Sequence, residues 1–92
     1  MKISEKKIEK ISEQILAFLY SKTPQSIFTS HIAQEIARDE EFVKKILIEL
    51  KLKKLIIEIK KNPQGINYLR RSRWKLSDVT YIAYKNHQKK TL

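Results

Sequence analysis

The sequence predicts a single small α+β domain, in which three helices are followed by a two-to-three-stranded β-hairpin and a final helix. Through the first half of the chain, apolar residues recur every three to four positions, as on the buried face of a helix, and from Leu55 the spacing changes to alternation. The chain's only glycine closes positions 62–65 (Asn-Pro-Gln-Gly), a sequence typical of the turn between two strands. With 92 residues, the chain is expected to form one domain over residues 1–92.

The first helix is predicted over residues 4–22. Ser4 is suited to cap it, because a serine side chain accepts a hydrogen bond from the unpaired backbone N–H groups of a first turn. The helix is expected to end before Pro24, since the residue before a proline avoids helical backbone angles. Its apolar stripe consists of Ile8, Ile11, Ile15, Phe18 and Leu19.

Two further helices, joined by a short connection, are predicted within residues 29–53 after a short extended piece over 26–28. Thr29 or Ser30 is expected to cap the first of them, and Asp39 the second. Two helices joined by about three residues form a helix-turn-helix. The buried stripe of the second of these helices is predicted to be Val43, Ile46, Leu47 and Leu50.

A β-hairpin is predicted over residues 55–76. Its second strand begins near Tyr68 and places Trp74 and Leu76 on one face, so Trp74 is expected to lie in the core rather than to stack on a base. In the first strand, Leu55, Ile57 and Ile59 share one face, and Ile56, Glu58 and Lys60 share the other.

The final helix is predicted over residues 78–87, capped by Ser77 and Asp78 and followed by a frayed tail over 88–92. With the arc that carries Val79, Ile82 and Ala83 buried, Tyr81 and Tyr84 would lie on the opposite side. Those two tyrosines are therefore candidates for a partner surface, most simply a homodimer contact. The alternative is a helix that lies in a groove and is buried on both sides.

The net positive charge lies entirely in the second half of the chain. Residues 1–50 carry eight basic and eight acidic side chains, whereas residues 51–92 carry twelve basic and two acidic ones. This asymmetry indicates a polyanionic partner that is contacted mainly by the second half. The alternative is the solvated surface of a lysine-rich protein.

The order of these elements resembles the winged-helix superfamily, which includes many small bacterial and archaeal DNA-binding regulators. The resemblance covers about residues 8–85. It is carried by residues 29–37 (TSHIAQEIA), 42–50 (FVKKILIEL) and 55–56 (LI), and by the aromatic-x-Leu-Ser sequence at 74–77 (WKLS). The glycines common between the two helices and before the first wing strand, where Lys54 stands, are absent. The resemblance implies that the third helix enters the DNA major groove while the hairpin, or wing, meets phosphates or the minor groove.

The outward face of the third helix supplies the first candidate contacts. Lys44 and Lys45 are expected to contact phosphates, and Ile48 to contact a thymine methyl group. The alternative is that both lysines only stabilise the helix, since Glu40 and Glu41 each precede one of them by four residues.

The wing supplies the second set, because it concentrates arginine, whose planar fork of donors suits phosphate oxygens and narrow minor grooves. The alternative is an edge strand that is charged to discourage aggregation. Tyr68 is a candidate for stacking on a base. The basic candidates are Arg70, Arg71, Arg73, Lys75, Lys60 and Lys61.

These features favour a DNA-binding transcription regulator with double-stranded DNA as partner and a homodimer as its state. An RNA-associated, ribosome-associated or architectural nucleic-acid binder and a protein-interaction module are the alternatives. The chain has no cysteine, and His31 and His87 lie far apart, so no metal site is expected. No catalytic constellation, cofactor motif or small-molecule substrate site is evident, and an enzyme is not expected. The absence of a membrane-length apolar run and of a signal-peptide pattern predicts a cytoplasmic protein.

Overall fold

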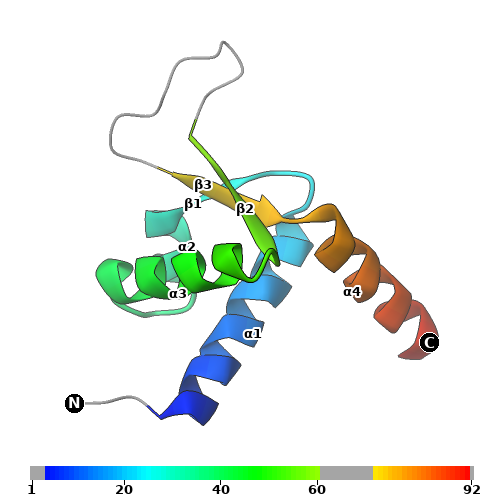
Figure 1. Cartoon of the computed structure of the whole chain (residues 1–92), viewed down its shortest axis with the longest axis horizontal. Coiled ribbons are helices and arrows are strands. Elements are labelled where there is room, and N and C mark those ends of the chain that lie inside the picture. The colour runs from blue at the N-terminus through cyan, green and yellow to red at the C-terminus, as the bar shows by residue number, and fades with distance from the viewer. Residues whose placement is uncertain (1–3, 61–71, 92) are drawn as a thin grey trace.

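The computed structural model of the chain describes residues 4–60 and 72–91, the last four of them by their backbone only. This part of the chain contains four helices and one three-stranded antiparallel sheet, which confirms the predicted α+β class (Figure 1). The elements are α1 (Glu5–Lys22), β1 (Ile27–Phe28), α2 (Thr29–Glu35), α3 (Glu40–Leu52), β2 (Ile56–Ile59), β3 (Arg73–Leu76) and α4 (Asp78–Thr91).

Helix α1 has the start and the end that the sequence predicts. The backbone N–H of Lys7 donates to the Ser4 side chain at 3.3 Å, and the helix ends at Thr23, directly before Pro24. The residues of α1 that face the core are Ile11, Ile15, Leu16 and Leu19.

Helices α2 and α3 form the predicted helix-turn-helix. Asp39 caps α3, accepting a hydrogen bond from the backbone N–H of Phe42 at 3.2 Å. The expected cap of α2 is wrong, because the residue before the helix is Phe28 and no side chain caps it. Thr29 is instead the first residue of α2, and its hydroxyl accepts a hydrogen bond from the buried indole of Trp74 in β3. The predicted buried stripe of α3 is confirmed.

Among the described residues, two that are not glycine adopt a left-handed backbone. Ala37, between α2 and α3, has φ 57°, and Lys54, before β2, has φ 64°. The resemblance to winged-helix sequences leads to the expectation of glycine at these two places. A side chain at such a position costs about 1–2 kcal/mol, because its Cβ approaches the following carbonyl oxygen. The chain therefore adopts a left-handed backbone at both positions without glycine.

The sheet has the order β1-β3-β2, so β3 is its central strand. Directly opposed residues of antiparallel strands share a face. Ile56 lies opposite Leu76, and Glu58 opposite Trp74, so these four side chains lie on one face. This is the face toward the core, because Ile56, Trp74 and Leu76 are buried while Ile57 is exposed. The core-facing side of β2, the first wing strand, is thus the side that carries the carboxylate of Glu58.

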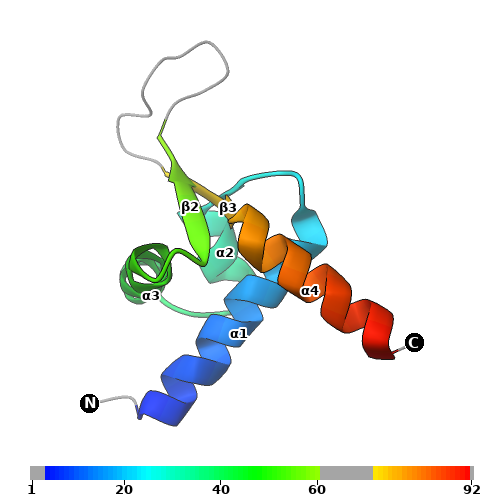
Figure 2. The ribbon, with the colours of Figure 1, turned by 45° about the vertical axis from the view of Figure 1, so that its right-hand side comes forward.

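The core lies between α1, α2, α3 and the inner face of the sheet. Figure 2 shows α3 almost end-on beside β2, and α4 passing beside α1. The predicted final helix is too short: α4 continues to Thr91, so residues 88–91 are helical rather than a frayed tail.

Candidate nucleic-acid interface

The outward face of α3 carries the three residues predicted for base and phosphate contact. Lys44 and Lys45 are exposed, and Ile48 is 42% exposed. Their position follows from the opposite stripe, because burying one side of a 3.6-residue helix turns these positions toward solvent. Glu41 and Leu52 share the same exposed face.

The two lysines form no ion pair within the described residues. Glu40 and Glu41 lie one turn before them, yet both ion pairs found within 4.0 Å in this part of the chain involve Glu58 instead. The acidic pair occupies the first turn of α3, where negative charge is favoured by the helix dipole. The ammonium groups of Lys44 and Lys45 therefore remain available to a partner.

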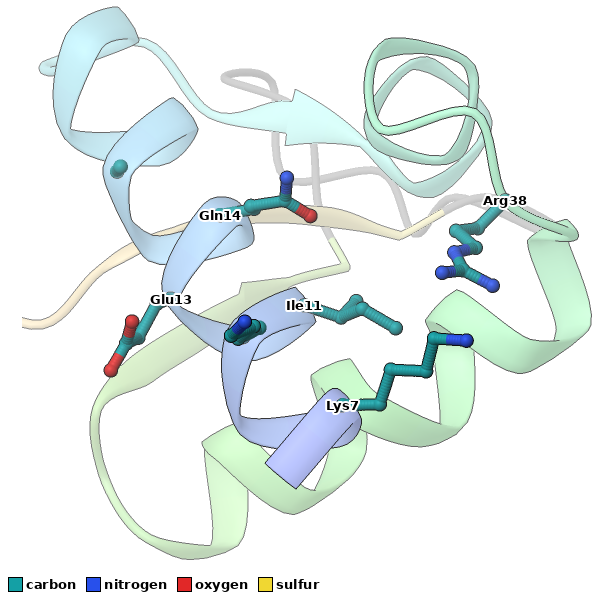
Figure 3. A pocket seen from close by; sticks show the side chains of 7 residues that line it. Lys7, Ile11, Glu13, Gln14 and Arg38 are labelled. Carbon is teal, nitrogen blue, oxygen red and sulfur yellow. The ribbon is translucent and has the colours of Figure 1, made fainter. Parts of the chain in front are cut away.

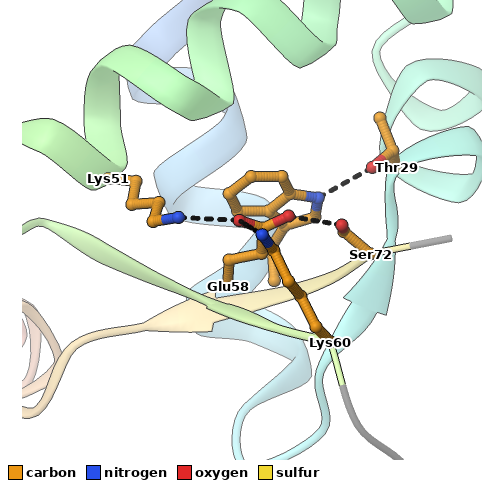
Figure 4. A network of polar contacts seen from close by, with 6 residues as sticks. Thr29, Lys51, Glu58, Lys60 and Ser72 are labelled. Carbon is orange, nitrogen blue, oxygen red and sulfur yellow. Dashed lines mark hydrogen bonds and ion pairs between the residues drawn. The ribbon is translucent and has the colours of Figure 1, made fainter. Parts of the chain in front are cut away.

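Glu58 joins the third helix to the base of the wing, a role the sequence did not reveal (Figure 4). Lys51 of α3 donates to Glu58 Oε1 at 2.8 Å, the Ser72 hydroxyl donates to Oε2, and Lys60 Nζ lies 3.9 Å from Oε1. The carboxylate thus holds a side chain from α3, one from before β3 and one from after β2. The only signal in the sequence was an acidic residue within a strongly basic segment.

The environment of Glu58 keeps it ionised. Burial alone would raise its pKa, but hydrogen bonds from Lys51 and Ser72, with the positive charges of Lys51 and Lys60, outweigh burial and lower the pKa below its usual value. The bound carboxylate also offsets part of the charge of Lys60, a candidate phosphate contact.

Trp74 lies in the core, as predicted. It is 0% exposed, and its indole Nε1–H donates to Thr29 Oγ1 at 2.7 Å. This bond ties the central strand of the sheet to the first turn of α2. A side chain so buried has no face on which a base could stack.

Arg73 and Lys75 project from the face of β3 opposite Trp74. Both are half-buried, and the Arg73 guanidinium lies 4.5 Å from the centre of the Phe28 ring, within the range of a cation–π contact. Arg73 is therefore packed against β1, at the base of the wing. The remaining wing candidates, Lys61, Tyr68, Arg70 and Arg71, lie outside the described residues.

The prediction for α4 is wrong about which side of the helix is buried and which is exposed. The rings of Tyr81 and Tyr84 lie 5.6 and 5.5 Å from the ring of Tyr20 in α1, and both pack against the core. Val79 and Ile82, expected to be buried, are instead 78% and 54% exposed. The tyrosine rings are long enough to fill the space between α4 and α1, which the smaller side chains of the other arc would leave empty.

This packing affects Tyr84 electrostatically. Burial raises the pKa of the Tyr84 hydroxyl, and the nearby carboxylate of Glu13 raises it further. Both effects favour the neutral hydroxyl, which suits a ring packed between two helices. The predicted use of Tyr81 and Tyr84 as the free face of α4 is wrong.

The described residues contain neither a membrane-spanning helix nor a cluster of metal-ligating side chains. Over this part of the chain, no helix combines the length and the apolar character needed to cross a membrane. Within the same residues, no cluster of three or more histidine, cysteine, aspartate or glutamate side chains could hold a metal ion.

A helix-turn-helix followed by a two-stranded wing, with β1 pairing beside the wing, defines the winged-helix fold, and the chain is a winged-helix domain. No protein-family model matches the chain, and no curated protein matches it.

Solved structures of bacterial proteins share this fold. MepR from S. aureus in complex with DNA is 21% identical over 92% of this chain and 69% of that one, with a TM-score of 0.71. A ZitR double mutant from Lactococcus lactis in its apo form is 21% identical over 94% and 60%, with a TM-score of 0.69. The PcaV transcriptional regulator of Streptomyces coelicolor, in complex with its natural ligand, is 18% identical over 84% and 49%, with a TM-score of 0.60. The chain spans 53% of a MepR mutant and 60% of this ZitR structure, little more than half of such proteins.

Proposed function

We propose that this chain is a DNA-binding transcription regulator that places α3 in the major groove and its wing along the backbone. The observation that carries the proposal is the outward face of α3, where Lys44 and Lys45 are exposed beside Ile48 and form no ion pair with any residue that the structure describes. The fold of this domain is shared with MepR, which has been solved in complex with DNA.

Each residue of this face has a chemical use in a major groove. Lysine ammonium groups donate to phosphate oxygens or to the N7 and O6 of guanine, and an aliphatic side chain contacts the methyl group of thymine. Lys44 and Lys45 suit the first role and Ile48 the second. The two glutamates at the start of α3 disfavour phosphate near that end, so the lysines would approach the backbone farther along the helix.

The wing is proposed to supply most of the phosphate contacts. The entire charge excess of the chain lies after residue 50. In this proposal Lys60, Lys61, Arg70, Arg71 and Lys75 bind phosphates or the minor groove, and Tyr68 stacks on a base or sugar. Arg73 takes part from its position against Phe28.

A homodimer is part of the proposal, but through the other face of α4. Val79 and Ile82 form an exposed apolar strip on a helix that extends from the body of the domain (Figure 1). A second copy packed on this strip would bury it, and the two-fold axis would present two copies of α3 to two half-sites about one helical turn of DNA apart.

Selection of bound duplexes from random DNA, beside an RNA competitor, tests the proposal. A regulator enriches one sequence and binds it about 10³-fold or more above random duplex. Preference for structured RNA would instead support the RNA-associated alternative. Weak, sequence-independent affinity for every nucleic acid would contradict the proposal and favour a protein-interaction module.

A further inference from the structure

A second basic surface lies away from the outward face of α3, in the half of the chain whose net charge is zero. An open hollow of about 520 Å³ is formed between α1 and the connection from α2 to α3 (Figure 3). We call it the α1 hollow; it is lined by Lys7, Lys10, Ile11, Glu13, Gln14, Ala17 and Arg38.

Donor groups from two distant parts of the sequence meet in the α1 hollow. The side chains of Lys7 and Arg38 extend from opposite sides toward the same space, and the Gln14 amide lies above it (Figure 3). The carboxylate of Glu13 turns away from this space in the same view. The apolar floor includes Ile11, which is buried.

None of the three cations of the hollow is paired with a carboxylate. In the part of the chain that the structure describes, both ion pairs are made by Glu58, so Lys7, Lys10 and Arg38 have no acidic partner within 4.0 Å. Positive groups that face one space repel each other, and a bound anion removes that repulsion. Arg38 follows the left-handed Ala37, whose backbone sets the direction in which the connection leaves α2.

We propose that the α1 hollow binds a phosphate group. An arginine guanidinium makes two parallel hydrogen bonds to phosphate oxygens, and a lysine ammonium adds a point charge. Arg38 supplies the first, Lys7 and Lys10 the second, and the amide N–H of Gln14 a further donor. The apolar floor admits the carbon framework to which the phosphate is attached.

Two sources share this chemistry, and the first rests on the proposed function. Arg38 lies two residues before α3 begins, so in the first source the hollow would hold a backbone phosphate on the far side of Glu40 and Glu41, away from the phosphates that Lys44 and Lys45 contact. A small phosphate-bearing compound is the second source. Its binding would act on the connection that holds α2 against α3.

The DNA source is tested by the salt dependence of duplex binding for the double variant Lys7→Gln/Arg38→Gln. Loss of one phosphate contact reduces the slope of log K against log salt by about one unit. The control Lys6→Gln/Lys85→Gln removes the same charge from positions that do not line the hollow. Each altered side chain is exposed, so both variants should keep the wild-type circular dichroism and melting temperature.

The second source is tested with inorganic phosphate, by following the ¹H–¹⁵N signals of the Gln14 amide and of Arg38 Nε. A phosphate site gives saturable shifts in phosphate that are absent in chloride of equal ionic strength and absent in Lys7→Gln/Arg38→Gln. If the slope of log K against log salt for duplex binding is smaller in this variant but not in the control, the hollow binds the DNA backbone. If that slope is unchanged and phosphate gives saturable shifts of the two signals, the hollow binds a small phosphate compound.

The proposal is overturned if Lys7→Gln/Arg38→Gln has the same salt slope as the control variant and if phosphate shifts neither signal more than chloride does. Its failure is distinct from failure of the proposed function. A wild-type chain that binds no duplex would contradict the proposed DNA-binding function, whereas the phosphate titration would still show whether the α1 hollow binds phosphate.

Discussion

Trp74 is the side chain on which the stability of this domain depends most, because it is the largest residue that the core buries completely. It belongs to the central strand, and its indole donates to Thr29 in the first turn of α2. Truncation to alanine therefore removes packing against the helices and one buried hydrogen bond at once. Trp74→Phe keeps most of the packing and removes the hydrogen bond.

The two substitutions should differ in magnitude. Truncation of a large buried aromatic side chain to alanine costs about 3–5 kcal/mol, and leaving a buried polar group without its partner costs about 1–3 kcal/mol. Trp74→Ala would thus consume a large share of the roughly 5–15 kcal/mol that stabilises a small domain. Trp74→Phe should cost about 1–3 kcal/mol, which lowers the melting temperature of a domain of this size by roughly 5–20 °C.

Urea unfolding at neutral pH measures both losses, and indole emission of the folded wild type reports the burial of Trp74 independently. Thr29→Val, which removes the acceptor but keeps the shape, completes a double-mutant cycle with Trp74→Phe, and the two losses should not add. An emission maximum equal to that of free tryptophan in water, or a loss below about 1 kcal/mol for Trp74→Ala, would refute this reasoning.

Three further predictions concern other parts of the fold. The folded pKa of Glu58 lies below its usual value of 4.5, so Glu58 stabilises the fold above that pH and loses this effect as pH falls through the folded pKa. Glu58→Gln should therefore be less stable than wild type in urea at pH 7, by a margin that shrinks as the pH is lowered. Ala37→Gly and Lys54→Gly should each raise the free energy of unfolding by about 0.5–1 kcal/mol, because the relief of the left-handed backbone outweighs the flexibility that glycine adds to the unfolded chain. A loss of stability would contradict the left-handed backbone at these two residues. Val79→Lys/Ile82→Lys should convert a dimer to a folded monomer in sedimentation, and a wild type that is monomeric at high micromolar concentration would contradict the dimer.

The elements of this fold were predictable because each has a local cause. Ser4 and Asp39 mark the starts of α1 and α3 through their own hydrogen bonds, and the alternating pattern in the second half marks the wing. The exposure of Lys44 follows from helical geometry once the opposite stripe is known to be apolar. The burial of Trp74 follows in the same way from its alternation with basic residues.

The errors arose where two local patterns were equally good and tertiary packing decided between them. Helix α4 has apolar or aromatic residues on both arcs, and only the position of Tyr20 on α1 shows that Tyr84 faces inward while Ile82 does not. Glu58 was not recognised because its partners, Lys51 and Ser72, are seven and fourteen residues away and meet it only when α3 and the wing pack together. No periodicity within one element contains that information.

The central claim of this account is that the domain binds duplex DNA with its wing contributing more than α3. It rests on the charge excess after residue 50, and on the position of Glu40 and Glu41 one turn before the lysines of α3. Arg73 is a poor residue for testing the claim, because it packs on Phe28 and its loss would also affect the fold.

The salt dependence of DNA affinity tests the claim most directly, with Arg70→Gln/Arg71→Gln compared against Lys44→Gln/Lys45→Gln. The wild-type slope of log K against log salt should be about −4 to −7, for roughly five to eight neutralised phosphates. The arginine variant should reduce the magnitude of this slope by about two units and the lysine variant by less, with the helical circular dichroism of both unchanged. If the lysine variant loses most of the affinity and the arginine variant almost none, α3 dominates binding and the claim is wrong.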